Sequence, residues 1–118
     1  MCGFVGIIGV EQASASLVLG LQAIQHRGQD AAGMGTWNRG QFSLEKEMGL
    51  VTTALPPAVI TAMQGSSGIS HVRYPTAGSS CSSEAQPFYV NNPFGITMAH
   101  NGNLVNTTAL QSELRKQW

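Results

Sequence analysis

The second residue of the chain is a cysteine, Cys2, directly behind the initiator Met1. Removal of Met1 would leave a chain that begins with a thiol and a free α-amine on one residue. An α-amine has a pKa of about 7.7–8.0 and a thiol one of about 8.5, so the amine can act as the base that activates the thiol. No histidine or aspartate partner is then needed. The position alone also fits a small apolar residue beside a buried strand, which is the more common role of such a cysteine.

An asparagine–glycine pair, Asn101-Gly102, follows an apolar stretch at 96–99. A side-chain amide next to a glycine N–H supplies two fixed neutral donors, which is what an oxyanion hole requires. Asn-Gly is also a common turn dipeptide, so an ordinary turn is the alternative.

Arg73 stands where an apolar stretch at 69–73 gives way to a long polar loop at 74–87. Its planar guanidinium can bind a substrate carboxylate through two parallel hydrogen bonds. A structural ion pair, or a solvated loop arginine, is the alternative. Long loops of this kind are usually functional.

Other residues that could take part in catalysis or ligand binding show less specific sequence patterns. His26, His71 and His100 match no zinc-binding spacing, so we predict no metal site and favour core or supporting roles for them. Cys81 lies in the serine-rich loop without an activating partner and is interpreted as an ordinary thiol. The glycines of the first ten residues do not form the motif of a dinucleotide site.

The elements of the first half follow from apolar periodicity and turn residues. A short apolar run with glycines predicts a buried strand, and apolar residues at helical spacing predict a helix with a glycine at its end. In order, we expect a strand at 4–10, a helix at 14–25 capped by Gly28, and a hairpin of 31–37 and 41–47 around Asn38-Arg39-Gly40.

The second half is less regular. Proline is favoured in the first turn of a helix, so Pro56-Pro57 predicts a short helix to about Met63, ended by Gly65. A strand at 69–73, the loop at 74–87 and a hairpin of 88–90 and 96–99 follow. A last helix is expected from Thr108, with Thr108 and Gln111 at capping-box spacing, and without a stop signal before Trp118.

Composition narrows the class of protein. The 118 residues suit one small domain, and six basic against six acidic residues give zero net charge, which argues against a nucleic-acid or anionic-membrane partner. Charged residues make up only 10% and hydrophobic ones 42%, so we expect faces that another body covers. Two cysteines form no disulfide framework, which favours a reducing, cytoplasmic compartment.

Four separated segments form a distinctive combination. They are Cys2-Gly3-Phe4-Val5-Gly6-Ile7, Gln25-His26-Arg27-Gly28-Gln29-Asp30-Ala31-Ala32-Gly33, His71-Val72-Arg73-Tyr74-Pro75-Thr76-Ala77-Gly78 and Ala99-His100-Asn101-Gly102-Asn103-Leu104. Together they closely resemble the N-terminal glutaminase domain of the amidophosphoribosyltransferase family. The first segment is shared with other class II glutamine amidotransferases, whereas the second and third point to this family. The resemblance spans the whole chain.

The resemblance implies an α+β fold of the N-terminal-nucleophile hydrolase type. In that fold two antiparallel sheets stack face to face between helical layers, an αββα sandwich. The elements expected here fit its first half. Residues 1–118 would thus be part of a class II glutaminase domain, with the rest of that domain and a C-terminal phosphoribosyltransferase domain absent.

The resemblance also implies roles for individual residues. Cys2 would be the nucleophile, with its own freed α-amine as base, and Asn101 and the Gly102 N–H would form the oxyanion hole. Arg73 would hold the α-carboxylate of glutamine, with Tyr74 and Thr76 in a loop that closes over the substrate. Arg27 and Asp30 are interpreted as structural residues that position the N-terminal strand.

The implied reaction is hydrolysis of the glutamine side-chain amide, with ammonia supplied for phosphoribosylamine formation from phosphoribosyl pyrophosphate, the first step of purine synthesis. The implied partners are L-glutamine, the phosphoribosyltransferase domain and further copies in a homo-oligomer. No cofactor is expected in this chain, and Mg²⁺ only in the absent domain.

Two points depart from the family pattern. The acidic residue expected to hold the substrate α-amine would lie beyond Trp118, and a retained Met1 would convert the catalytic amine into an amide. The alternatives are therefore another class II amidotransferase, such as glucosamine-6-phosphate synthase or asparagine synthetase, or an inactive fragment that associates through sheet edges and low-charge faces.

Overall fold

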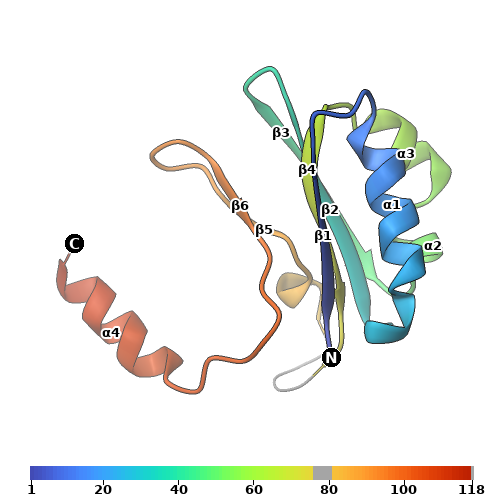
Figure 1. Ribbon diagram of the computed structural model, residues 1–118. Helices are drawn as coiled ribbons and strands as arrows, with labels where there is room; N and C mark the ends of the chain where they lie inside the picture. Colours follow the sequence, from blue (N-terminus) through green and yellow to red (C-terminus); the bar gives the residue numbers. More distant parts are fainter. Residues whose placement is uncertain (76–80, 118) are drawn as a thin grey trace.

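The computed structural model describes residues 1–75 and 81–117. Its centre is a four-stranded antiparallel sheet in the order β1-β4-β2-β3. Figure 1 shows three helices on one side of this sheet and a two-stranded sheet, β5-β6, with the last helix on the other. The strands are β1 (Gly3–Ile8), β2 (Ala31–Asn38), β3 (Gln41–Met48), β4 (Ser67–Arg73), β5 (Phe88–Val90) and β6 (Ile96–Met98). The helices are α1 (Ala13–Ala23), α2 (Val51–Ala54), α3 (Pro57–Ala62) and α4 (Thr107–Gln117), with short 3₁₀ helices η1 (Gln25–Arg27) and η2 (Ser82–Glu84).

The strand register of the central sheet places the start of β1 beside the end of β4. Strand β1 pairs with β4 so that Gly3 lies opposite Val72, and β4 pairs with β2 so that Val72 also lies opposite Ala32. Side chains alternate between the faces of a sheet, so Val72 points to one face and its neighbours His71 and Arg73 to the other. This alternation separates the hydrophobic core from the candidate site.

The core lies between the sheet and α1. Leu17 and Leu21, one helical turn apart on α1, are both fully buried, as are Met34 of β2 and Val72 of β4. The predicted apolar face of the first helix is therefore confirmed. Burial of such side chains is the main term that holds a small domain together, at roughly 1.5–3 kcal/mol for each.

The hairpin of β2 and β3 turns where the sequence predicted. Arg39 and Gly40 both have positive φ, 48° and 90°, as in the two-residue turns that match the twist of paired strands. Glycine adopts such an angle without steric cost, whereas Arg39 is the only described non-glycine residue with positive φ. The expected short helix after Pro56-Pro57 is also present, with Pro57 in its first turn.

The expectation that Gly28 caps the first helix is wrong. The α-helix ends at Ala23, the 3₁₀ helix η1 follows, and Gly28 has extended backbone with φ −165°. A Cβ at Gly28 would lie 2.6 Å from the carbonyl carbon and oxygen of Arg73. The glycine is needed because the end of β4 passes directly against it.

Other boundaries differ from prediction by one to two residues, and one helix was missed. Strand β4 begins at Ser67 because pairing with β1 and β2 extends it backward. Thr108 lies inside α4, which begins at Thr107, so the capping role expected for Thr108 is wrong. The missed helix, α2, starts where Gln25 Oε1 accepts a hydrogen bond from Val51 N at 2.8 Å, a contact from 26 positions away.

The face of the sheet away from α1 is only partly covered. The β5-β6 hairpin reaches it through Phe42 and Tyr89, whose ring centroids are 5.3 Å apart, and through Lys46, which lies 5.0 Å above the Phe88 ring. Large apolar side chains nearby stay exposed, including Phe4 at 56% and Ile8 at 86%, and every described residue of α4 is exposed. The apolar faces that the composition predicted are therefore present. Among the described residues, no helix is long and apolar enough to cross a bilayer.

Candidate active site

Cys2 lies directly before β1 and is held through its carbonyl oxygen. That oxygen accepts hydrogen bonds from Arg27 Nε at 2.9 Å and from Asn101 Nδ2 at 3.2 Å. The first bond comes from η1 and the second from the segment after β6. Arg27 therefore contacts the N-terminal strand, as its expected structural role requires. Asn101 and Cys2, 99 positions apart in sequence, lie side by side.

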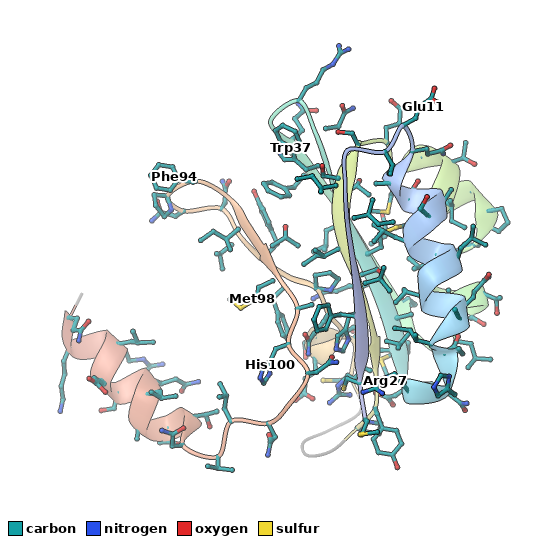
Figure 2. All side chains as sticks on the ribbon, in the orientation of Figure 1. Glu11, Arg27, Trp37, Phe94, Met98 and His100 are labelled. Carbon is teal, nitrogen blue, oxygen red and sulfur yellow. The ribbon has the colours of Figure 1, made fainter. Side chains whose placement is uncertain are left out.

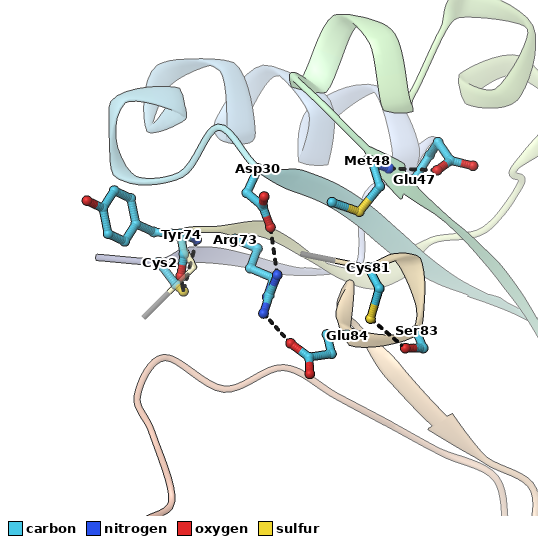
Figure 3. A network of polar contacts seen from close by, with 9 residues as sticks. All are labelled: Cys2, Asp30, Glu47, Met48, Arg73, Tyr74, Cys81, Ser83 and Glu84. Carbon is cyan, nitrogen blue, oxygen red and sulfur yellow. Dashed lines mark hydrogen bonds and ion pairs between the residues drawn. The ribbon is translucent and has the colours of Figure 1, made fainter. Parts of the chain in front are cut away.

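The thiol of Cys2 is half-buried and contacts the main chain of Tyr74. Tyr74 N donates to the sulfur at 3.3 Å, and the sulfur lies 3.6 Å from the Tyr74 carbonyl oxygen (Figure 3). The pairing of Gly3 with Val72 places the residue after β4 beside the residue before β1.

The backbone bends at Gly102, at the edge of this site. Gly102 has φ 149°, in the region that favours glycine, and a Cβ there would lie 2.9 Å from the His100 ring. The backbone is bent here, without the hydrogen-bonded turn that the alternative reading expected at Asn101-Gly102. The side chain of Asn101 points at Cys2, which places an amide donor next to the thiol-bearing residue.

Arg73 is buried and faces two carboxylates. Its Nη1 lies 2.6 Å from Asp30 Oδ2, and its Nη2 pairs with Glu84 (Figure 3). The structural ion pair that was the alternative for Arg73 is therefore seen, and Asp30 is one of the two carboxylates in it. Because Glu84 is 39% exposed in its side chain, it is the carboxylate that another anion could displace.

A buried histidine lies next to the site, in keeping with the core or supporting role that the sequence favoured. His71 on β4 is fully buried, and neither ring nitrogen makes a hydrogen bond to a described residue. Burial lowers the pKa of His71 to about 4, although the His100 main chain and the Asn101 side chain act to raise it. The imidazole is therefore neutral at pH 7. Its position in the third segment was visible in the sequence, but its proximity to Asn101 was not.

The remaining predicted residues are placed as follows. Tyr74 has its ring half exposed, and its main chain makes the contacts with Cys2. Thr76 lies outside the described residues. Cys81 Sγ lies 2.9 Å from Ser83 Oγ. Within residues 1–75 and 81–117, no three His, Cys, Asp or Glu side chains gather as a metal site would require.

The fold of the chain, with Cys2 directly before its first strand, defines a structural class. It is an α+β fold of the N-terminal-nucleophile hydrolase type, and two solved structures match it over 99% of this chain. The fold expected from the sequence resemblance is thus confirmed. No family model matches the chain.

Within this class, the chain matches amidophosphoribosyltransferases, and that resemblance is confirmed in sequence and in fold. It is 53% identical to the enzyme of Pseudomonas aeruginosa, 54% to that of Escherichia coli and 50% to that of Saccharomyces cerevisiae, over 97%, 97% and 94% of this chain. A solved structure described as the allosteric regulatory enzyme of purine biosynthesis matches with a TM-score of 0.87 at 36% identity. A glutamine phosphoribosylpyrophosphate amidotransferase from B. subtilis, complexed with ADP and GMP, matches with 0.83 at 34%.

The match covers nearly all of this chain but only a part of each protein that it matches. It takes in 99% of this chain but 25% of each solved chain, and 22–23% of the three curated relatives. The chain therefore spans about a quarter of the length of the proteins that it matches.

Proposed function

We propose that the protein hydrolyses the side-chain amide of glutamine to glutamate and ammonia through an N-terminal cysteine. The observation that carries the proposal is the hydrogen bond from Asn101 Nδ2 to the Cys2 carbonyl oxygen. It brings a neutral amide donor to the only described cysteine that could also carry a free α-amine. The matches to amidophosphoribosyltransferases support the same reaction class.

The reaction begins with removal of Met1. While Met1 is attached, the Cys2 nitrogen is an amide and has no basic lone pair. Met1 is 74% exposed, so an aminopeptidase can reach it. The freed α-amine then accepts the proton of the Cys2 thiol, and the Tyr74 N–H stabilises the resulting thiolate.

The thiolate attacks the side-chain carbonyl carbon of glutamine, forming a carbon–sulfur bond. The carbonyl oxygen becomes an oxyanion, which the Asn101 amide and the Gly102 N–H stabilise by hydrogen bonds. Collapse of this intermediate breaks the carbon–nitrogen bond, and the α-ammonium returns its proton to the leaving nitrogen, so that ammonia departs and a thioester remains.

Water then completes the reaction. The α-amine takes a proton from the water as its oxygen attacks the thioester carbonyl, and the same two donors stabilise the second oxyanion. Breaking the carbon–sulfur bond releases glutamate, and the α-ammonium returns its proton to the sulfur, which restores the Cys2 thiol. The glutaminase step needs no cofactor in this scheme.

Glutamine recognition would use the buried guanidinium group of Arg73. Arg73 would bind the substrate α-carboxylate by exchanging its contact with Glu84 for one with the substrate, while Asp30 keeps the guanidinium in place. Tyr74 would contribute to a loop that closes over the bound glutamine. An acidic residue for the substrate α-amine would come from outside residues 1–118.

For the whole protein, we propose that residues 1–118 are the first part of a longer class II glutaminase domain. Its ammonia would form phosphoribosylamine from phosphoribosyl pyrophosphate in a C-terminal phosphoribosyltransferase domain, the first step of purine synthesis. Mg²⁺ would act in that domain. A cytoplasmic homo-oligomer is the assembly that we propose.

The direct test is an intact mass of the protein after incubation with an electrophilic glutamine analogue. We expect a chain that lacks Met1 and carries one adduct, because the analogue places its reactive carbon where the glutamine carbonyl would lie. The Cys2→Ser variant should carry none. An adduct that persists in this variant, or a processed and folded wild-type protein without any adduct, contradicts the proposed site.

Arg73→Lys tests substrate recognition. Lysine keeps the positive charge but loses the planar pair of donors, so the KM for glutamine should rise about tenfold or more while kcat changes less. Steady-state glutaminase kinetics on the full-length protein measure this. The matched variant is Glu84→Gln, which weakens the competing carboxylate and should lower that KM. An unchanged KM in both variants would remove the carboxylate-binding role from Arg73.

A further inference from the structure

We infer that Gln86 is a positioning residue of this site: its side-chain amide holds the main chain of His100 so that Asn101 lies beside Cys2. The inference rests on the proposed function, because it concerns the proposed oxyanion hole. Gln86 touches neither Cys2 nor the place of the reacting carbonyl by any contact seen here. It acts through the residue next to Asn101.

The contact between Gln86 and His100 uses both ends of the amide. His100 N donates to Gln86 Oε1 at 2.7 Å, and Gln86 Nε2 donates to the His100 carbonyl oxygen at 3.2 Å. A side-chain amide that satisfies the N–H and the C=O of one residue imitates the pairing of a neighbouring strand. It therefore fixes both the position and the orientation of the peptide groups around His100.

Hydrogen bonds matter here because packing does not hold this segment. Residues 100–106 are all exposed, so few apolar contacts restrain them. Figure 2 shows His100 on the side of the sheet away from α1. Asn101 follows His100 directly, and its Nδ2 reaches the Cys2 carbonyl oxygen at 3.2 Å. A shift of His100 is passed on to the Asn101 amide.

Gln86 itself is anchored to the sheet. Lys46 Nζ on β3 donates to the Ala85 carbonyl oxygen at 2.7 Å, and burial lowers the pKa of this lysine. On β2, a Cβ at Gly33 would lie 2.1 Å from the Gln86 carbonyl oxygen, so only glycine allows this approach. Pro87 is fully buried. The segment that carries Gln86 is therefore fixed, and the amide can transmit that position to His100.

The test replaces Gln86 with methionine, which keeps the length of the side chain and removes both hydrogen bonds. Gln22→Met on the exposed surface of α1 is the matched control. Two rates are measured on the full-length protein: steady-state glutamine hydrolysis and alkylation of Cys2 by iodoacetamide. Alkylation forms no oxyanion at a carbonyl group, so its rate reports on the thiol and not on the oxyanion hole.

We expect Gln86→Met to lower kcat about 10- to 100-fold, because a misplaced oxyanion donor loses much of its effect. The KM for glutamine and the alkylation rate should stay within about twofold of wild type, since Arg73 and Cys2 are untouched. Gln22→Met should leave all three values unchanged. Lys46→Met, which keeps the amide but loosens its anchor, should lower kcat in the same direction by a smaller factor.

An unchanged kcat in Gln86→Met overturns the inference. Equal losses in hydrolysis and in alkylation overturn it too, because they indicate a general structural role. If Gln86→Met does not fold, the Lys46→Met variant decides: an unchanged kcat counts against the inference and a selective loss supports it. Failure of the proposed function has a different signature, namely a Cys2→Ser protein that still hydrolyses glutamine.

Discussion

Replacing Cys2 with serine is expected to lower glutamine hydrolysis by at least about 10³-fold in the full-length protein. A serine hydroxyl is a far weaker acid than a thiol, so an α-amine can hardly deprotonate it. The attacking anion is therefore almost lost. The fold should be kept, because the Cys2 thiol is only half-buried and its hydrogen-bonding contacts are with the Tyr74 main chain. Synthesis of phosphoribosylamine from added ammonia should remain near the wild-type rate, since it does not use the thiol.

The two half-reactions are compared in one preparation, with ammonium salts or glutamine as nitrogen donor. Cys81→Ser is the matched control, because Cys81 is the other described cysteine and its sulfur lies 2.9 Å from Ser83 Oγ. It should keep both activities. Equal loss of glutamine- and ammonia-dependent synthesis in Cys2→Ser would indicate a structural role for Cys2 instead.

Asn101→Ala is expected to lower kcat for glutamine hydrolysis about 10²- to 10³-fold, the usual cost of removing one oxyanion-hole donor. The KM for glutamine should change little, because the ground-state carbonyl oxygen carries less charge than the oxyanion. The variant also loses the hydrogen bond to the Cys2 carbonyl oxygen, but Arg27 Nε still binds that oxygen at 2.9 Å. The Cys2 main chain should thus stay in place.

Initial-rate kinetics with glutamine measure this split between kcat and KM. Asn103→Ala, two residues further along the same exposed segment, is the control and should behave like wild type. The oxyanion role of Asn101 is wrong if the variant keeps its kcat, or if the rate of Cys2 alkylation falls as far as kcat does. In the second case Asn101 acts on the nucleophile rather than on the transition state.

Local structure was predicted well where neighbouring residues decide it. The Asn38-Arg39-Gly40 turn was predicted because glycine accepts positive φ, and the face of α1 because apolar residues recur at helical spacing. These signals depend on backbone stereochemistry and on the burial of side chains a few positions apart. They are therefore readable from the chain alone.

Local structure was missed where a distant residue decides it. Helix α2 starts at an N–H that the Gln25 side chain binds, and Gly28 is required by the end of β4 rather than by a helix cap. The structural preferences of neighbouring residues do not reveal either of these long-range contacts. The low pKa of His71 likewise follows from its burial in a sheet whose paired residues, Phe4 and Gly33, are distant in sequence.

By itself, the sequence determined which chemical groups the protein carries: a cysteine behind the initiator methionine, an asparagine–glycine pair, and an arginine at the end of a strand. It also determined the kind of fold, through four segments that resemble one family of glutaminases. Only the tertiary structure decided that Asn101 reaches Cys2, that Arg73 lies between Asp30 and Glu84, and that Gln86 holds His100. The physical reason is that these contacts depend on strand register and on the path of exposed loops, which arise only when β1, β4 and the segment after β6 meet.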